Sequence, residues 1–176
     1  TNNNTAVTRF TVAVNRPYTD KDGNKTADFI DCVAFDKKAE FLSKYFKKGS
    51  SVIVFGVGGV GSWCAEALAR SGVGRITVVD GDTVSETNKN RQIIALSSTE
   101  GKEKADVCAA RLRDINPDCT VESVNLFYSA ETKCEIDLTK FDYIADCIDT
   151  VTSKLLLISS AKELNLPIIS SMGTGN

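Results

Sequence analysis

The order of hydrophobic and polar residues changes its period near residue 50, which predicts two regions of different structure. Residues 7–14 alternate between apolar and polar side chains and are rich in β-forming residues, so we expect a strand there. Residues 28–35 predict a second strand, and an Asp-Gly turn between the two strands predicts a hairpin. A stripe at helical spacing then predicts a helix over residues 36–48, formed by Ala39, Leu42, Tyr45 and Phe46.

Beyond residue 50, short apolar runs that are typical of buried parallel strands alternate with helical stripes. The predicted strands are residues 52–55, 75–80, 119–125, 141–149 and 167–170. The predicted helices are residues 62–71, 103–115 and 153–164, with a weaker helical pattern over 130–138. This alternation predicts right-handed crossovers and an α/β fold, a doubly wound parallel sheet with strand order 3-2-1-4-5. We therefore expect one domain over residues 1–50 and another over residues 51–176.

Four glycines separate the first strand of the second region from the helix that follows: Gly56, Gly58, Gly59 and Gly61. Glycines permit a tight turn and let a ligand approach the backbone. The free N–H groups and the dipole of the following helix favour an anion above such a turn. The stretch therefore predicts a bound phosphate, against the alternative of a tight turn that serves only close helix packing.

The residues after the second strand favour ATP over a dinucleotide. Asp80 ends that strand at the spacing that brings a carboxylate beside the ribose of a nucleotide bound at the glycines. A triphosphate requires cations that spread the charge of the leaving pyrophosphate, whereas a dinucleotide requires an apolar slot. The polar side chains that favour the triphosphate are Asp82, Asn88, Arg91, Gln92 and Lys104. The alternative is that Arg91 and Lys104 are solvated surface charges.

Asp149 ends the fourth strand and faces the crevice where open α/β sheets bind their ligands. Mg²⁺ prefers one or two carboxylates together with phosphate oxygens, so Asp149 is the candidate magnesium ligand. A cap at the start of the next helix is an equally good interpretation of this residue. Cys147, between two acidic residues, is expected to be a buried structural thiol, because nearby acids raise the pKa of a thiol.

Composition narrows the function further. The net charge of −2 does not favour a nucleic-acid binder over the whole chain, and the absence of histidine removes the commonest general base. The six cysteines form no Cys-x-x-Cys pair, which predicts free thiols in a reducing, cytoplasmic setting. No apolar run approaches the roughly 20 residues of a membrane helix, so we expect no membrane partner.

The first region resembles bacterial single-stranded DNA-binding proteins over residues 5–16, 27–35, 37–40 and 45–49. These stretches correspond only to the middle of that family's OB-fold, so the resemblance implies a hairpin and helix from a partial OB-fold. It also implies contacts to single-stranded DNA through Arg16, Tyr18, Phe29 and Phe35. The alternative is that Phe29 and Phe35 are core residues of a fragment without its barrel.

The second region resembles the ATP-dependent adenylating enzymes, which include molybdopterin-synthase and thiazole-biosynthesis adenylyltransferases and ubiquitin-activating enzymes. The motifs lie at residues 56–62, 70–75, 79–82, 87–92, 113–117 and 146–149. Residues 149–154 and 169–176 resemble more narrowly the tRNA threonylcarbamoyladenosine dehydratases, which cyclise that modified base with ATP. The resemblance implies a Rossmann-like domain that adenylates a carboxylate, with ATP and Mg²⁺ as cofactors and tRNA as a partner.

The same resemblance assigns roles to individual residues. Gly58 and Gly59 would line the phosphates, and Asp80 would hold the ribose. Asn88, Arg91 and Lys104 would bind the triphosphate, and Asp149 would hold Mg²⁺, so the catalytic residues would be Arg91, Lys104 and Asp149. In that family, amino-terminal helices supply an arginine to the ATP site across a homodimer.

Here the DNA-binding-like segment takes the position of those helices. We therefore hypothesise an engineered chimera, joined near residues 48–56, whose turnover is lost. The remaining alternatives are a single-stranded DNA-binding module and a folded recombinant without a physiological function.

Overall fold

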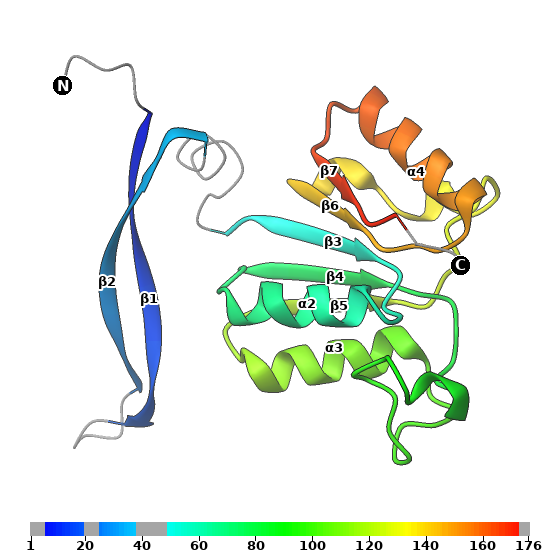
Figure 1. Cartoon of the computed structure of the whole chain (residues 1–176), viewed down its shortest axis with the longest axis horizontal. Helices are drawn as coiled ribbons and strands as arrows, with labels where there is room; N and C mark the ends of the chain where they lie inside the picture. Colours follow the sequence, from blue (N-terminus) through cyan, green and yellow to red (C-terminus); the bar gives the residue numbers. More distant parts are fainter. Residues whose placement is uncertain (1–5, 20–24, 38–48, 173–176) are drawn as a thin grey trace. The chain divides into compact units, whose positions relative to one another are not determined.

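The computed structural model describes the backbone of residues 6–19, 25–37 and 49–172, and the side chains of residues 6–9, 31–37 and 49–172. The chain divides into two compact units, Thr1–Lys47 and Lys48–Asn176. We call them the hairpin unit and the sheet unit, and describe each by itself (Figure 1).

The hairpin unit contains two long antiparallel strands, β1 (Val7–Thr19) and β2 (Lys25–Phe35). Their pairing runs from Val7 opposite Phe35 to Thr19 opposite Lys25, with an irregular register between Asn15 and Thr19. Both strands were expected from the alternating pattern, although each is longer than that pattern. The helix expected over residues 36–48 lies almost entirely outside the described residues.

The sheet unit is built on five parallel strands: β3 (Ser51–Phe55), β4 (Arg75–Val79), β5 (Thr120–Val124), β6 (Tyr143–Asp146) and β7 (Ile168–Ser170). Their spatial order is β5-β4-β3-β6-β7. Numbered within this unit, the order is 3-2-1-4-5, which confirms the predicted doubly wound α/β sheet. The carboxyl ends of β3, β4 and β6 therefore meet at the point where the strand order reverses.

Among the described residues, three helices cover the sheet: α2 (Gly61–Arg70), α3 (Lys104–Ile115) and α4 (Val151–Glu163). Figure 1 shows α2 and α3 on one face and α4 on the other. The expected fourth strand was too long at both ends, because β6 spans only Tyr143–Asp146 and residues 147–149 belong to neither a strand nor a helix.

The weak helical pattern over residues 130–138 was wrong as an α-helix. That part of the chain forms two short 3₁₀ turns, Lys133–Glu135 and Leu138–Lys140. The carboxylate of Asp137 accepts the N–H of Thr139 and so caps the second turn locally. A further 3₁₀ turn, Glu86–Asn88, lies in the long loop after β4.

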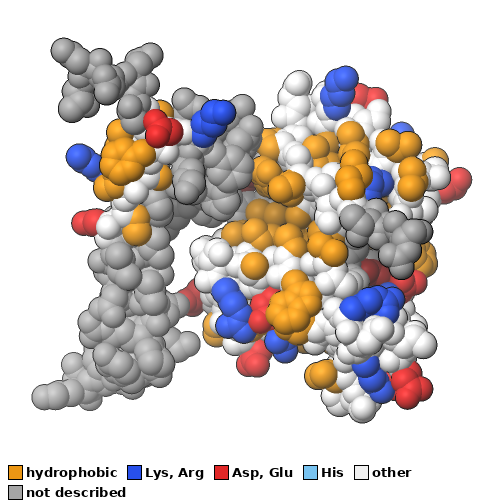
Figure 2. Space-filling model, in the orientation of Figure 1, with side chains coloured by type: hydrophobic (Ala, Val, Ile, Leu, Met, Phe, Trp, Pro, Cys, Tyr) orange, Lys and Arg blue, Asp and Glu red, His pale blue; other side chains and the backbone are white. Residues whose placement is uncertain are grey.

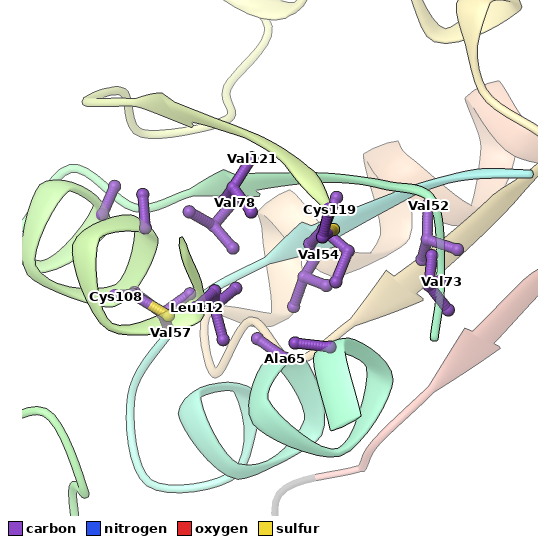
Figure 3. Close-up of a cluster of buried hydrophobic side chains, with 14 of the residues drawn as sticks. Val52, Val54, Val57, Ala65, Val73, Val78, Cys108, Leu112, Cys119 and Val121 are labelled. Carbon is purple, nitrogen blue, oxygen red and sulfur yellow. The ribbon is translucent and has the colours of Figure 1, made fainter. Parts of the chain in front are cut away.

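Strand β3 supplies side chains to both sides of the sheet because successive residues point to opposite faces. Val52 and Val54 pack with α2 and α3, in a cluster that also holds Leu112. Figure 3 shows side chains of β3, β4 and α3 converging there. Ile53 and Phe55 belong to the second core, on the side of α4.

Two expectations from composition can be compared with the described residues. All six cysteines are present as free thiols. Among the helices of the described part, none has the length and apolar character that crossing a bilayer requires.

Candidate nucleotide-binding site

The turn between β3 and α2 brings two backbone segments into very close contact. Gly56 has φ +78°, and a Cβ there would lie 2.8 Å from the carbonyl oxygen of Cys147. A Cβ on Gly61 would lie 1.7 Å from the carbonyl oxygen of Gly56. Both positions therefore require glycine, and the start of α2 is held against the end of β3. No acidic residue occupies the first turn of α2, so no carboxylate of that turn offsets the positive end of its dipole.

Asp80 connects this turn to the loop that follows β4. Its Oδ2 accepts the N–H of Val57 at 2.7 Å, and its Oδ1 accepts the N–H of Asp82 at 2.9 Å. These two bonds fix the orientation of the carboxylate. Because each carboxylate oxygen has a further lone pair, Asp80 can still accept hydrogen bonds from the hydroxyls of a ribose.

Besides Asp80 and Asp82, the loop after β4 contributes three further predicted side chains. Asn88 is buried, and its Oδ1 accepts the N–H of Ser85 at 3.1 Å. Gln92 is only 6% exposed, and its Oε1 has no hydrogen-bond partner among the described residues. Arg91 is exposed, and its Nη1 donates to the carbonyl oxygen of Thr87 at 2.9 Å. An unpartnered buried amide oxygen is costly, which favours a donor from a ligand or water at Gln92.

Lys104 begins α3 and is buried beside the same loop. Its Nζ lies 2.8 Å from Oδ2 of Asp82, and its side chain is 8% exposed. The interpretation of Lys104 as a solvated surface charge was therefore wrong. A buried ammonium group with a single carboxylate partner can also bind an anion that enters from the cleft.

Asp149 lies in the short segment between β6 and α4 and is exposed. The residue at the N-cap of α4 is Thr150, and no side chain caps this end through a hydrogen bond. The alternative that Asp149 caps the helix was therefore wrong. Within the described residues, no group of three or more His, Cys, Asp or Glu side chains could hold a metal by itself. Asp149 thus fits Mg²⁺ only together with oxygens from a bound phosphate.

One cleft of about 480 Å³ brings most of the predicted residues together. Its lining includes Gly56, Gly58, Gly59, Asp80, Asp82, Asn88, Arg91, Gln92, Lys104 and Asp149. Gly61 is not part of the lining, because it packs against Gly56 beneath the turn. Figure 2 shows acidic and basic side chains next to one another at the end of the sheet unit where the strand arrowheads of Figure 1 lie.

The predicted DNA-binding residues lie on the hairpin unit. Arg16 and Tyr18 fall in the irregular stretch of β1, and Phe29 lies on β2 opposite Ala13. The side chains of these three residues are outside the described set. Phe35 ends β2 and is 56% exposed.

Sequence reasoning missed the wall of the cleft that follows β5. Leu126, Phe127 and Tyr128 line the cleft, and the ring of Phe127 stands against Gly81. A Cβ on Gly81 would lie 2.6 Å from this ring, which is 62% exposed. The sequence contained a signal for this wall: these residues follow a predicted strand, and the carboxyl ends of the strands in such a sheet face the ligand crevice.

A buried ion pair behind Asp149 was also missed. Asp146 is fully buried, and its Oδ2 accepts Nζ of Lys154 at 2.7 Å. Lys154 also donates to Oγ of Ser170 and to the carbonyl oxygen of Ser171. The other oxygen of Asp146 accepts the N–H of Ile148. This network ties β6, α4 and β7 together next to the segment that carries Asp149.

Cys147 lines the cleft, but its environment does not favour a nucleophile. Its pKa is raised, first because it shares a hydrogen bond with Cys64, then because of burial and the nearby charge of Asp146. The same contact lowers the pKa of Cys64 to about 7. The raised pKa agrees with the expectation of a structural thiol, but the expectation that Cys147 is buried was wrong, because the residue is only partly buried.

A family model described as the ThiF family matches residues 40–176. This chain belongs to the ThiF family. A second model, described as the single-strand binding protein family, matches residues 1–67, so the two matches overlap over residues 40–67.

Curated relatives of this ThiF-family chain include tRNA threonylcarbamoyladenosine dehydratases. The protein from Bacillus subtilis is 50% identical over 129 residues, which are 73% of this chain and 51% of that protein. The protein from Escherichia coli is 44% identical over 124 residues, 70% of this chain and 46% of that protein. The chain therefore spans about half the length of these relatives.

Solved structures show the same relationship. The Escherichia coli tRNA N6-threonylcarbamoyladenosine dehydratase in complex with ATP matches with a TM-score of 0.67 and 39% identity. The match covers 77% of this chain and 58% of that chain. The complex of the same protein with AMP gives a TM-score of 0.69. The ThiF-like Rossmann fold expected from the sequence is thus confirmed.

Proposed function

We propose that this ThiF-family chain binds ATP in the cleft of the sheet unit and performs the nucleotide-binding part of an adenylation reaction. The observation that carries the proposal is the convergence of Asp80, Lys104 and Asp149 on one cleft beside the glycine turn. The complexes of a related dehydratase with ATP and AMP support it.

The geometry gives each residue a role in the bound state. The dipole of α2 and the backbone at Gly58 and Gly59 attract the phosphates. Asp80 accepts hydrogen bonds from the ribose hydroxyls, and Lys104 and Arg91 neutralise the phosphates further along. Asp149 would hold Mg²⁺, and the ion would supply positive charge to stabilise the leaving pyrophosphate.

The reaction that these groups favour is attack of a carboxylate oxygen on the α-phosphate of ATP. The bond from the α-phosphorus to the bridging oxygen breaks, and pyrophosphate leaves with the electron pair. Positioning and charge stabilisation dominate such a transfer, which suits a chain without histidine. We propose threonylcarbamoyladenosine in tRNA as the substrate class, by relationship to the dehydratases.

Calorimetric titration with ATP and Mg²⁺ tests the proposed binding. We expect saturable binding that Asp80→Ala weakens by about tenfold or more, because the ribose loses a charged acceptor. Asp114→Ala is the matched control, since Asp114 is an exposed carboxylate of α3 outside the cleft. An unchanged affinity in Asp80→Ala would contradict the site.

Exchange of labelled pyrophosphate into ATP tests the chemical step. We propose that the 176-residue chain exchanges pyrophosphate only near background, because the matched region is about half of each relative. Exchange well above background that Lys104→Met abolishes would contradict the proposed loss of turnover.

Binding of single-stranded DNA is a second candidate function. The match of residues 1–67 to the single-strand binding protein family favours it. An oligo-dT titration should then give an affinity that falls steeply with salt and with Tyr18→Ala. An affinity that is independent of both would exclude this function.

We further propose that the chain is a chimera of these two families, engineered by joining their segments near residues 48–56. The overlap of the two family matches over residues 40–67 supports a join within this range. Unfolding of residues 48–176 alone, compared with the whole chain, tests one consequence of such a join, namely that the sheet unit is stable without the first segment. Equal midpoints are expected, and a much lower midpoint for residues 48–176 would contradict a sheet unit that folds independently of residues 1–47.

A further inference from the structure

We propose that Asp82 is a positioning residue for the proposed ATP site, which holds the ammonium group of Lys104 where the outer phosphates bind. This inference rests on the proposed function and adds a role for a carboxylate that would otherwise oppose an anionic ligand. Asp82 itself would then make no contact with the nucleotide.

The first observation is the asymmetric burial of the ion pair. Lys104 Nζ and Asp82 Oδ2 are 2.8 Å apart, with side chains 8% and 54% exposed. Asp82 therefore lies at the open side of the pair, and Lys104 lies beneath it. An ammonium group has three protons, so the bond to Asp82 still lets Lys104 donate to phosphate oxygens.

The second observation is that the two residues are joined twice. The N–H of Lys104 donates to the carbonyl oxygen of Asp82 at 2.9 Å, in addition to the ion pair. An isolated bridge between Thr83 and Glu103 continues this contact. The first residue of α3 is thus fastened, by backbone and side chain, to the loop after β4.

The third observation connects this pair to the glycine turn. The N–H of Asp82 donates to Oδ1 of Asp80, whose Oδ2 accepts the N–H of Val57. Backbone and side-chain bonds therefore run from the turn through Asp80 to Asp82 and Lys104. The position of the cation is set relative to the turn and the proposed ribose ligand.

Two roles of Asp82, positioning of Lys104 and direct repulsion of the nucleotide, predict opposite changes in ATP affinity when the carboxylate is removed. A carboxylate near a triphosphate repels it, so removing Asp82 should strengthen ATP binding if the charge acts directly. If Asp82 acts through Lys104, the same change should weaken ATP binding. Without Asp82 the lysine side chain is mobile in the free protein, so it loses more conformational entropy when ATP binds.

Calorimetry with ATP and with AMP, each with Mg²⁺, separates these outcomes. For Asp82→Ala we expect the dissociation constant for ATP to rise about tenfold or more. The constant for AMP should change less than about twofold, since AMP lacks the outer phosphates. In the Lys104→Met background, Asp82→Ala should cause no further loss.

Three results would overturn the inference: tighter or unchanged binding of ATP, equal losses for ATP and AMP, or an additive loss in the double variant. Equal losses with a lowered unfolding midpoint would assign the ion pair to stability alone. If Asp82→Ala does not fold, Asp82→Asn keeps the shape of the side chain, and its dissociation constants for ATP and AMP are compared in the same way. Failure of the unchanged chain to bind ATP contradicts the proposed function itself, and is separate from every result with the variants.

Discussion

A Cβ atom on Gly61 would stand 1.7 Å from the carbonyl oxygen of Gly56. Neither partner can yield easily, because one is the first residue of α2 and the other is backbone at the end of β3. We expect Gly61→Ala to separate the helix from the strand and to lower the free energy of unfolding by about 3 kcal/mol or more. Urea denaturation followed by circular dichroism measures this loss.

Gly59→Ala is the control for that experiment. Its Cβ would meet the side chain of Arg91 at 3.4 Å, and a flexible side chain can move. The unfolding midpoint should therefore change little, while the cleft becomes narrower. Equal destabilisation by both substitutions would mean that the close approach at Gly61 is not the cause.

The buried pair of Lys154 and Asp146 should be expensive to break from one side. Lys154→Met leaves the carboxylate of Asp146 buried without its cation, so we expect a loss of about 3–5 kcal/mol in the free energy of unfolding. The double variant Lys154→Met/Asp146→Leu removes both charges and should recover part of this loss. Urea titrations of the unchanged chain, Lys154→Met and the double variant test this order of stability. A double variant less stable than Lys154→Met would contradict it.

Glu66 should make the stability of the sheet unit depend on pH. Arg111, and then Arg70, hold the pKa of Glu66 below its ordinary value. Because the pKa is lower in the folded state, the stabilisation is present above the unfolded pKa of about 4.3 and disappears as pH falls through the folded value. Glu66→Gln should cost about 1–2 kcal/mol at pH 7, since both arginines are partly exposed.

The test for Glu66 compares thermal or urea unfolding of the two proteins between pH 7 and pH 3. The difference in stability should shrink on acidification. Glu122→Gln is a suitable control, because its partner Arg75 and Glu122 itself are about half exposed. A difference that stays constant down to pH 3 would contradict the role of the charge.

Phe127 should contribute to the base end of the proposed nucleotide site. Its exposed ring lines the cleft beside Gly81, and stacking of a base on an aromatic ring is worth about 1–3 kcal/mol. Phe127→Ala should therefore weaken ATP and AMP by the same factor, roughly fivefold or more. Calorimetry measures the two dissociation constants, and a loss of affinity restricted to ATP would assign the ring to the phosphate end of the site.

The architecture of the sheet unit could be predicted because its strands are short, apolar and separated by helical stripes. The order of the strands is that of a doubly wound sheet, and such a sheet brings Asp80 and Asp149 to the same edge because both follow the carboxyl ends of parallel strands. The glycine requirement at Gly56 was likewise visible in the sequence, and its φ of +78° shows the reason.

Side-chain partnerships could not be predicted in the same way. Nothing in the sequence pairs Asp82 with Lys104, because the loop between them has no periodicity that fixes its path. The pairing of Asp146 with Lys154 depends on how α4 turns back over β6. The helix predicted over residues 130–138 was wrong for another reason: local capping by Asp137 favours a tight turn over a continuous helix.

Strand β3 pairs with β4 along one edge and with β6 along the other, and all five of its residues are buried. Its amide protons therefore cannot reach solvent through fraying or loop motion. They should exchange with deuterium only when the whole sheet unit opens. Exchange at Val54, measured by NMR, then reports the global free energy of unfolding, whereas faster exchange at Arg91 reports local opening of the cleft.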